Sequence, residues 1–130
     1  MSDGRRITLR GAAVAEIEEK RSVFIAYAAP VRSEDEAHAI IEEKKKEYAD
    51  ATHNVWAYYI DGGARARCSD DGEPQGTSGA PMVQMMVKEG LTNLIVVVTR
   101  YFGGIKLGTG GLVRAYTSSA KLGLEAAGVC

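Results

Sequence analysis

Apolar residues along this chain form short continuous or alternating runs in some segments and recur every three to four residues in others. These patterns predict five strands and three helices. Short runs rich in β-branched and aromatic residues favour strands over residues 14–19, 23–31, 55–60, 65–69 and 94–99. Apolar residues spaced three and four apart favour helices over residues 33–50, 77–90 and 110–127. The resulting order, β-β-α-β-β-α-β-α, predicts an α/β two-layer sandwich in which three helices pack on a mixed sheet of four or five strands.

Length and composition describe one globular domain. The chain has 130 residues, of which 45% are hydrophobic and 25% charged, and its net charge is −1. No apolar run approaches the roughly 20 residues that cross a bilayer, and no apolar core follows the basic N-terminal residues as in a secretion signal. The two cysteines, Cys68 and Cys130, make no disulfide framework. We therefore expect a cytoplasmic protein that has no membrane partner.

Charge is distributed unevenly along the chain. Residues 90–124 contain no aspartate or glutamate but four cations, whereas acidic residues concentrate in the first predicted helix. This asymmetry predicts a basic face formed or bordered by Arg65, Arg67, Arg100, Lys106 and Arg114. The alternative, that these cations are merely solvated, remains equally open.

A glycine-rich segment follows the most apolar strand and begins the last helix. Its glycines are Gly103, Gly104, Gly108, Gly110 and Gly111. The spacing resembles a P-loop, but Thr109 stands where the phosphate-binding lysine belongs, and Val113 breaks the dinucleotide-binding fingerprint. What remains is an anion-binding nest at a helix start, with Lys106 and Arg114 as charge partners. The alternative is that the glycines only permit a sharp turn and close contact between helix and sheet.

A second block, residues 69–81, combines turn residues with three carboxylates. Asp70, Asp71 and Glu73 surround a glycine, and either form a turn that caps the next helix or hold Mg²⁺. We favour the turn and cap. Gly76, Thr77 and Ser78 follow, and Thr77 and Ser78 are expected to cap that helix.

Other reactive residues form no recognisable catalytic or metal-binding set. The histidines and cysteines lack zinc-ligand spacing, and a pairing of Cys68 with His53 lacks an orienting third group. Tyr101 and Phe102 beside two cations resemble an aromatic, basic surface that stacks a base. We therefore expect no metal site, no cofactor and no catalytic residue.

The two blocks together carry a family resemblance. SDDGEPQGTSGAPM at residues 69–82, VVTRYFGGIKLGTGGLVRAY at 97–116 and HNVWAY at 53–58 resemble the IMPACT/YigZ family. The resemblance implies a domain of the Impact N-terminal type over residues 1–130. It also implies the superfold of small-ribosomal-subunit-protein domain 2, shared with domain IV of elongation factor G and GHMP kinases. Bacterial members usually carry a ferredoxin-like C-terminal domain, which we expect to be absent here, leaving open whether the chain is a fragment or a single-domain member.

Eukaryotic members of that family regulate translation by binding the activator of an amino-acid-starvation kinase. The resemblance therefore implies a non-enzymatic binding domain for translation or stress regulation, with RNA, a ribosomal surface or a translation-factor partner as ligand. The alternative is a phosphate or nucleotide site with Mg²⁺-dependent activity, in which Asp70 or Asp71 holds the metal. A third is a protein adaptor anchored by Tyr101 and Phe102. The oligomeric state stays open.

Overall fold

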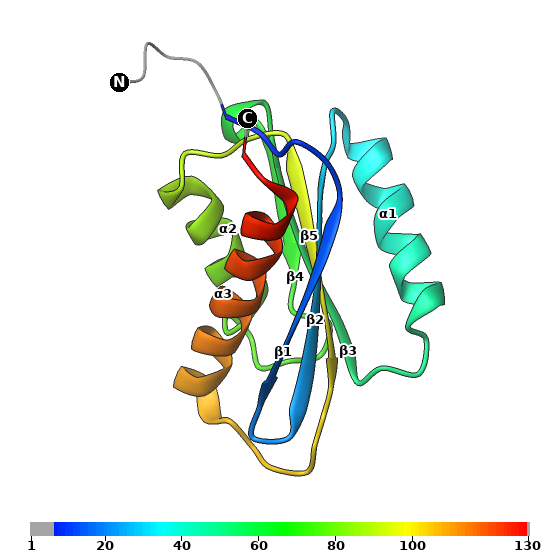
Figure 1. The fold of residues 1–130 in the computed structure, drawn as a ribbon, viewed down its shortest axis with the longest axis vertical. Helices are drawn as coiled ribbons and strands as arrows, with labels where there is room; N and C mark the ends of the chain where they lie inside the picture. The colour runs from blue at the N-terminus through cyan, green and yellow to red at the C-terminus, as the bar shows by residue number, and fades with distance from the viewer. Residues whose placement is uncertain (1–6, 130) are drawn as a thin grey trace.

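The computed structural model describes residues 7–129 and contains the predicted elements in the predicted order (Figure 1). The strands are β1 (Ala13–Glu19), β2 (Ser22–Pro30), β3 (His53–Ile60), β4 (Arg65–Ser69) and β5 (Leu94–Tyr101). The helices are α1 (Glu34–Glu47), α2 (Gly79–Lys88) and α3 (Gly108–Ala127), and a short 3-10 turn, η1 (Asp61–Gly63), joins β3 to β4. No helix of this described part is long and apolar enough to cross a membrane.

The five strands form one sheet in the order β1-β2-β5-β3-β4, and β5 is its central strand as its apolar sequence predicts. The expected mixed sheet is wrong in one respect, because every strand pairs antiparallel with its neighbours. The crossover through α1 does join two parallel strands, β2 and β3. These strands are not neighbours, however, because β5 lies between them and runs antiparallel to both.

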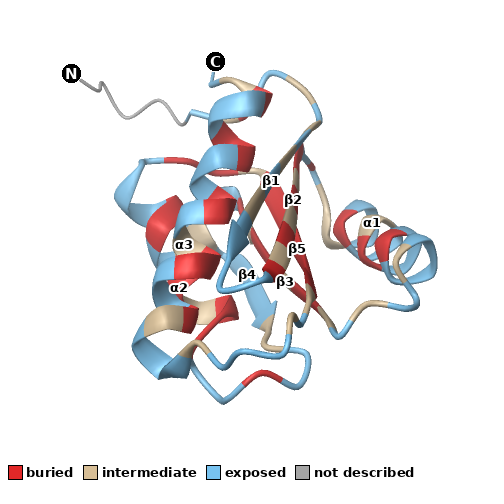
Figure 2. Cartoon of the chain, turned by 60° about the horizontal axis from the view of Figure 1, so that its bottom comes forward, coloured by how far each residue is buried: buried red, intermediate tan, exposed pale blue. Residues whose placement is uncertain are grey.

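Helices cover both faces of the sheet, so the fold has three layers rather than the two expected from sequence (Figures 1 and 2). Successive β5 side chains point to opposite faces, and both sets are buried. Leu94, Val96 and Val98 join the cluster beneath α2 and α3. Ile95 and Val97 join a smaller cluster beneath α1.

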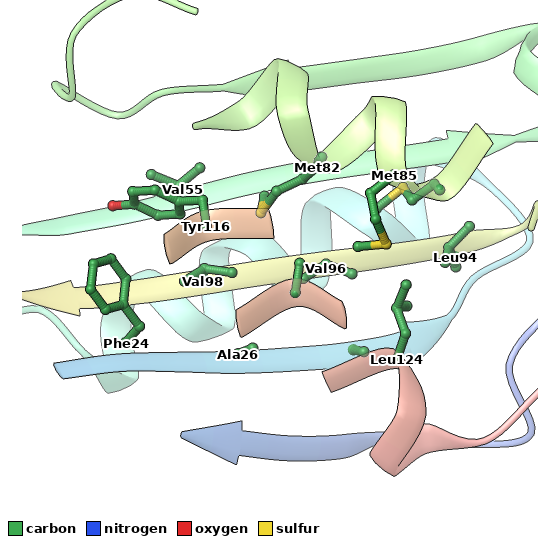
Figure 3. Close-up of a cluster of buried hydrophobic side chains, with 14 of the residues drawn as sticks. Phe24, Ala26, Val55, Met82, Met85, Leu94, Val96, Val98, Tyr116 and Leu124 are labelled. Atoms are coloured by element: carbon green, nitrogen blue, oxygen red, sulfur yellow. The ribbon is translucent and has the colours of Figure 1, made fainter. Parts of the chain in front are cut away.

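Side chains of the larger cluster hold α3 against the sheet (Figure 3). The ring of Tyr116 from α3 meets the edge of Phe24 from β2, with ring centroids 5.2 Å apart and planes at 88°. Such edge-to-face pairs add about 0.5–1.5 kcal/mol beyond burial. The glycine-rich segment is thereby held at one end of the sheet.

Candidate functional site

Arg100 and Glu73 join the two sequence blocks inside the protein. Arg100 lies near the end of β5, and its Nη1 donates to Oε2 of Glu73 at 2.7 Å. Both residues are buried, with 4% and 8% of their surfaces exposed. Because a buried charge is costly unless it is paired and hydrogen-bonded, this pair fixes the 69–81 block against the end of the sheet.

The rest of the Arg100 guanidinium is also occupied by protein groups. Its Nε and Nη2 donate to Oγ of Ser22 at 3.3 and 3.2 Å. Its central carbon also lies 5.5 Å from the ring centroid of Phe24 and 5.3 Å from that of Phe102. The sequence predicts that Arg100 forms or borders a basic face, but the residue is buried. It instead acts as an internal positioning group.

Tyr116 completes the contacts of the Glu73 carboxylate. Its hydroxyl donates to the same Oε2 at 2.6 Å. Burial, followed by this hydrogen bond to a carboxylate, raises the pKa of Tyr116 far above its ordinary value, so the hydroxyl remains a donor. One carboxylate thus connects the block at 69–81, β5 and α3.

His53 stands at the beginning of β3, directly opposite Arg100 in the sheet register. Its Nδ1 lies 2.7 Å from the carbonyl oxygen of Asp71, which can only accept, so Nδ1 carries the proton. Its Nε2 faces Oε1 of Glu73 at 3.4 Å. Both ring nitrogens therefore face acceptor oxygens, and Nε2 is turned toward the buried carboxylate.

The carboxylates of the 69–81 block point to different partners. Asp70 accepts from the backbone N–H groups of Gly76, Ser78 and Gly79 at 2.9, 3.2 and 2.8 Å, which caps α2. Asp71 accepts from the N–H of Asn54 at 2.6 Å. Within residues 7–129 no three such side chains gather as a metal-binding group.

The side chain that caps α2 is not the one expected from the sequence. Ser78 occupies the N-cap position of α2, but its side chain makes no capping hydrogen bond. Thr77 and Ser78 are buried and bond to each other at 3.1 Å, while Thr77 also donates to the carbonyl of Pro74 at 2.6 Å. The capping group is therefore Asp70, as the turn-and-cap interpretation of the acidic cluster predicts.

The glycine-rich segment forms the connection from β5 to α3. A Cβ atom on Gly103 would lie 2.0 Å from the carbonyl oxygen of Arg21, so this glycine permits a close approach to the β1–β2 turn. α3 begins at Gly108, two residues earlier than predicted, without a capping side chain or an acidic residue in its first turn. Gly104, Thr109 and Gly110 are exposed there, and Gly111 is half-buried.

A pocket of about 390 Å³ lies where these elements meet, and we call it the Phe102 pocket. Its floor is the buried network, and its rim belongs to the glycine-rich segment. The lining residues are Thr52, His53, Glu73, Pro74, Arg100, Phe102, Lys106, Leu107, Gly108, Thr109 and Leu112. Lys106 is exposed on this rim, beside the uncapped start of α3. The pocket thus joins an apolar lining to an electropositive edge.

The other predicted cations lie elsewhere. Arg114 is exposed on α3 and lines a neighbouring hollow of about 230 Å³ with Lys20 and Glu19. In the register of β3 and β4, Arg65 lies opposite Ile60 and Arg67 lies opposite Tyr58. Residues that lie opposite each other on neighbouring strands share a face of the sheet. That face is the one beneath α1, because both partners belong to its cluster. The expected single basic face is therefore divided between the two sides of the sheet.

Sequence reasoning missed His53 as part of this site. Its place becomes visible only with the strand order, because pairing of β3 with β5 brings His53 opposite Arg100. Cys68, whose pairing with His53 was considered above, is exposed in β4. Cys130 lies outside the described residues.

Comparison with known proteins agrees with this architecture. Residues 20–124 match the Impact N-terminal domain family. The IMPACT family member YvyE of Bacillus subtilis (strain 168) is 46% identical over 94% of this chain and 57% of its own length. A crystal structure titled as that of a hypothetical protein superposes with a TM-score of 0.89 at 35% identity, covering 96% of this chain and 62% of that one.

A second solved structure carries a functional description. It is that of the two-domain translational regulator Yih1, with a TM-score of 0.59 and 29% identity over 92% of this chain and 48% of Yih1. The chain therefore spans about half to three fifths of the length of these three proteins. The match over residues 20–124, with the identity to YvyE, shows that this chain belongs to the IMPACT family.

Proposed function

We propose that this chain is a non-enzymatic binding domain that takes part in the regulation of translation and that binds RNA at the start of α3. One observation carries the RNA-binding part. Exposed Lys106 and Arg114 flank the uncapped start of α3, and no acidic residue occurs in residues 90–124 to offset their charge. The link to translation is supported by the structural similarity to Yih1, a two-domain translational regulator.

The electrostatics of this region favour a phosphate backbone. Uncapped backbone N–H groups and the positive end of the helix dipole attract anions. Among residues 7–129, neither Lys106 nor Arg114 forms an ion pair. Glu73, the acid that lines the Phe102 pocket, is already compensated by Arg100. Approaching phosphates therefore meet two cations outside any ion pair, and in the hollow beside Arg114 the charge of Lys20 offsets that of Glu19.

The test is RNA binding as a function of salt. We expect a single-stranded RNA to bind with an affinity that falls as salt rises, because cations on the protein release counterions from the phosphates. Lys106→Glu with Arg114→Glu should weaken binding at least tenfold and flatten the salt dependence. The matched control is Lys45→Glu with Lys46→Glu, which makes the same charge change at exposed positions of α1.

Two results would contradict the proposal. One is that the wild-type chain binds no RNA under any salt condition, which would favour a protein partner. The other is that both double variants bind alike.

A second candidate is a mononucleotide site, favoured by the size of the Phe102 pocket, which lies within the range of small-molecule sites. A thermal-shift screen of nucleotides with Mg²⁺ distinguishes it, because a bound ligand raises Tm.

A further inference from the structure

We propose that the Phe102 pocket holds one unstacked base of a single-stranded RNA, while the adjoining phosphate lies beside Lys106. This inference rests on the proposed RNA-binding function and adds to it the kind of RNA that the site selects. It follows from three properties of the pocket: a fixed aromatic wall, hydroxyl groups at its rim, and a charge pattern that is neutral at the floor and positive at the edge.

The aromatic wall is fixed before any ligand arrives. Phe102 is 46% exposed, yet its ring lies 5.3 Å from the Arg100 guanidinium, and its backbone N–H donates to Oγ1 of Thr52 at 2.9 Å. Exposed aromatic rings that are anchored in this way serve as platforms for bases, because every base presents a flat π-face. Leu107 and Leu112 supply further apolar lining.

The rim carries groups that can bond the edge of a base. Oγ1 of Thr52 accepts from the backbone N–H of Phe102, which leaves its own O–H to donate. The exposed Thr109, in the first turn of α3, adds a second hydroxyl-bearing residue to the pocket lining. A base in a duplex is paired and stacked, so its edge and faces do not reach such a pocket. Aromatic side chains bind bases that are already unpaired.

The charge pattern places the phosphate at the rim and the base inside. Glu73 at the floor is paired with Arg100 at 2.7 Å and bonded by Tyr116 at 2.6 Å, so the pocket interior carries no uncompensated carboxylate. Lys106 adds one positive charge at the exposed edge, next to the uncapped helix start. A neutral base and an anionic phosphate match this division.

The test compares four ligands on the folded chain: a single-stranded 12-nucleotide RNA, its duplex, an abasic phosphodiester chain of equal length, and free nucleoside monophosphates. We expect the single strand to bind about tenfold tighter than the duplex and the abasic chain. Phe102→Ala should remove this preference and leave the weaker, salt-dependent binding of the abasic chain unchanged. Free monophosphates binding as tightly as the single strand would overturn the inference in favour of a mononucleotide site.

Three variants control for structure and for simple loss of apolar surface. Ile105→Ala removes a similarly exposed apolar side chain (43%) from the same segment but outside the pocket lining, and should bind as the wild type does. Phe102→Tyr retains the ring and should keep the preference, whereas Phe102→Leu retains apolar volume without a π-face and should lose it.

The failures of the two proposals are distinguishable. If single strand, duplex and abasic chain bind equally, or Phe102→Leu keeps the preference, the base-binding pocket is wrong while RNA binding at Lys106 and Arg114 stands. If the wild-type chain binds none of these RNAs, both proposals fail.

Discussion

Nη1 of Arg100 and Oε2 of Glu73 lie 2.7 Å apart, although 27 positions separate the residues in the chain. This contact connects the two sequence blocks that identify the family. It also forms the floor of the Phe102 pocket, so the stability of the fold and the shape of the site depend on the same pair.

Breaking this pair should destabilise the protein strongly. We expect Arg100→Ala or Glu73→Ala to lower the free energy of unfolding by about 3–5 kcal/mol, because each leaves an uncompensated buried charge. The double variant should cost less than the sum of the single ones. Urea denaturation of the four proteins measures the coupling, and additive losses would show that the pair is not coupled.

The capping role of Asp70 gives a second prediction. Asp70→Ala should lower the free energy of unfolding by about 1–2 kcal/mol, because the N–H groups at the start of α2 lose their acceptor. Ser78→Ala should cost less, since the Ser78 hydroxyl makes no capping bond. Equal losses measured by urea denaturation would place the cap on Ser78 instead.

The close approach at Gly103 gives a third prediction. Gly103→Ala should destabilise the protein by more than about 2 kcal/mol, because the new Cβ would overlap the backbone of Arg21. Gly11→Ala is the matched control, since a Cβ there meets nothing within 4 Å. Thermal unfolding compares the two variants, and a Tm unchanged in both would contradict the geometry at Gly103.

Tyr58 gives a prediction for the dependence of stability on pH. Burial, followed by its hydrogen bond of 2.5 Å to Glu34, raises the pKa of Tyr58 from 10.0 to about 12. The folded state therefore holds this proton more tightly than the unfolded state does. The resulting stability is fully present below pH 10 and is lost as pH rises from 10 to 12.

The measurement is urea denaturation at pH 9 and pH 11. Tyr58→Phe should lose less stability over this interval than the wild type. Tyr59→Phe is the matched neighbour, because the Tyr59 hydroxyl donates to the carbonyl of Gly62 rather than to a carboxylate. The same loss in wild type and Tyr58→Phe would show that Tyr58 does not set this dependence.

The sequence predicts the elements well because local patterns determine them. The apolar run at 94–99 predicts a central strand, and β5 occupies that place. The antiparallel pairing and the third layer depend on where β5 inserts, which is a property of the whole sheet. No local pattern encodes that insertion.

The site is less predictable because its contacts are distant in sequence. Arginine is a residue type that usually lies on the surface. Arg100 is buried because Glu73 compensates its charge. His53 joins the site through strand pairing with β5. The acidic cluster is the exception, since Asp70 lies close in sequence to the helix that it caps.

The central place of β5 has a consequence for folding during synthesis. β1 pairs with β2, and β3 pairs with β4, but these two hairpins share no ladder with each other. Only β5, which is made last among the strands, joins them. As the chain leaves the ribosome, no strand ladder can therefore connect the two hairpins until residues 94–101 emerge.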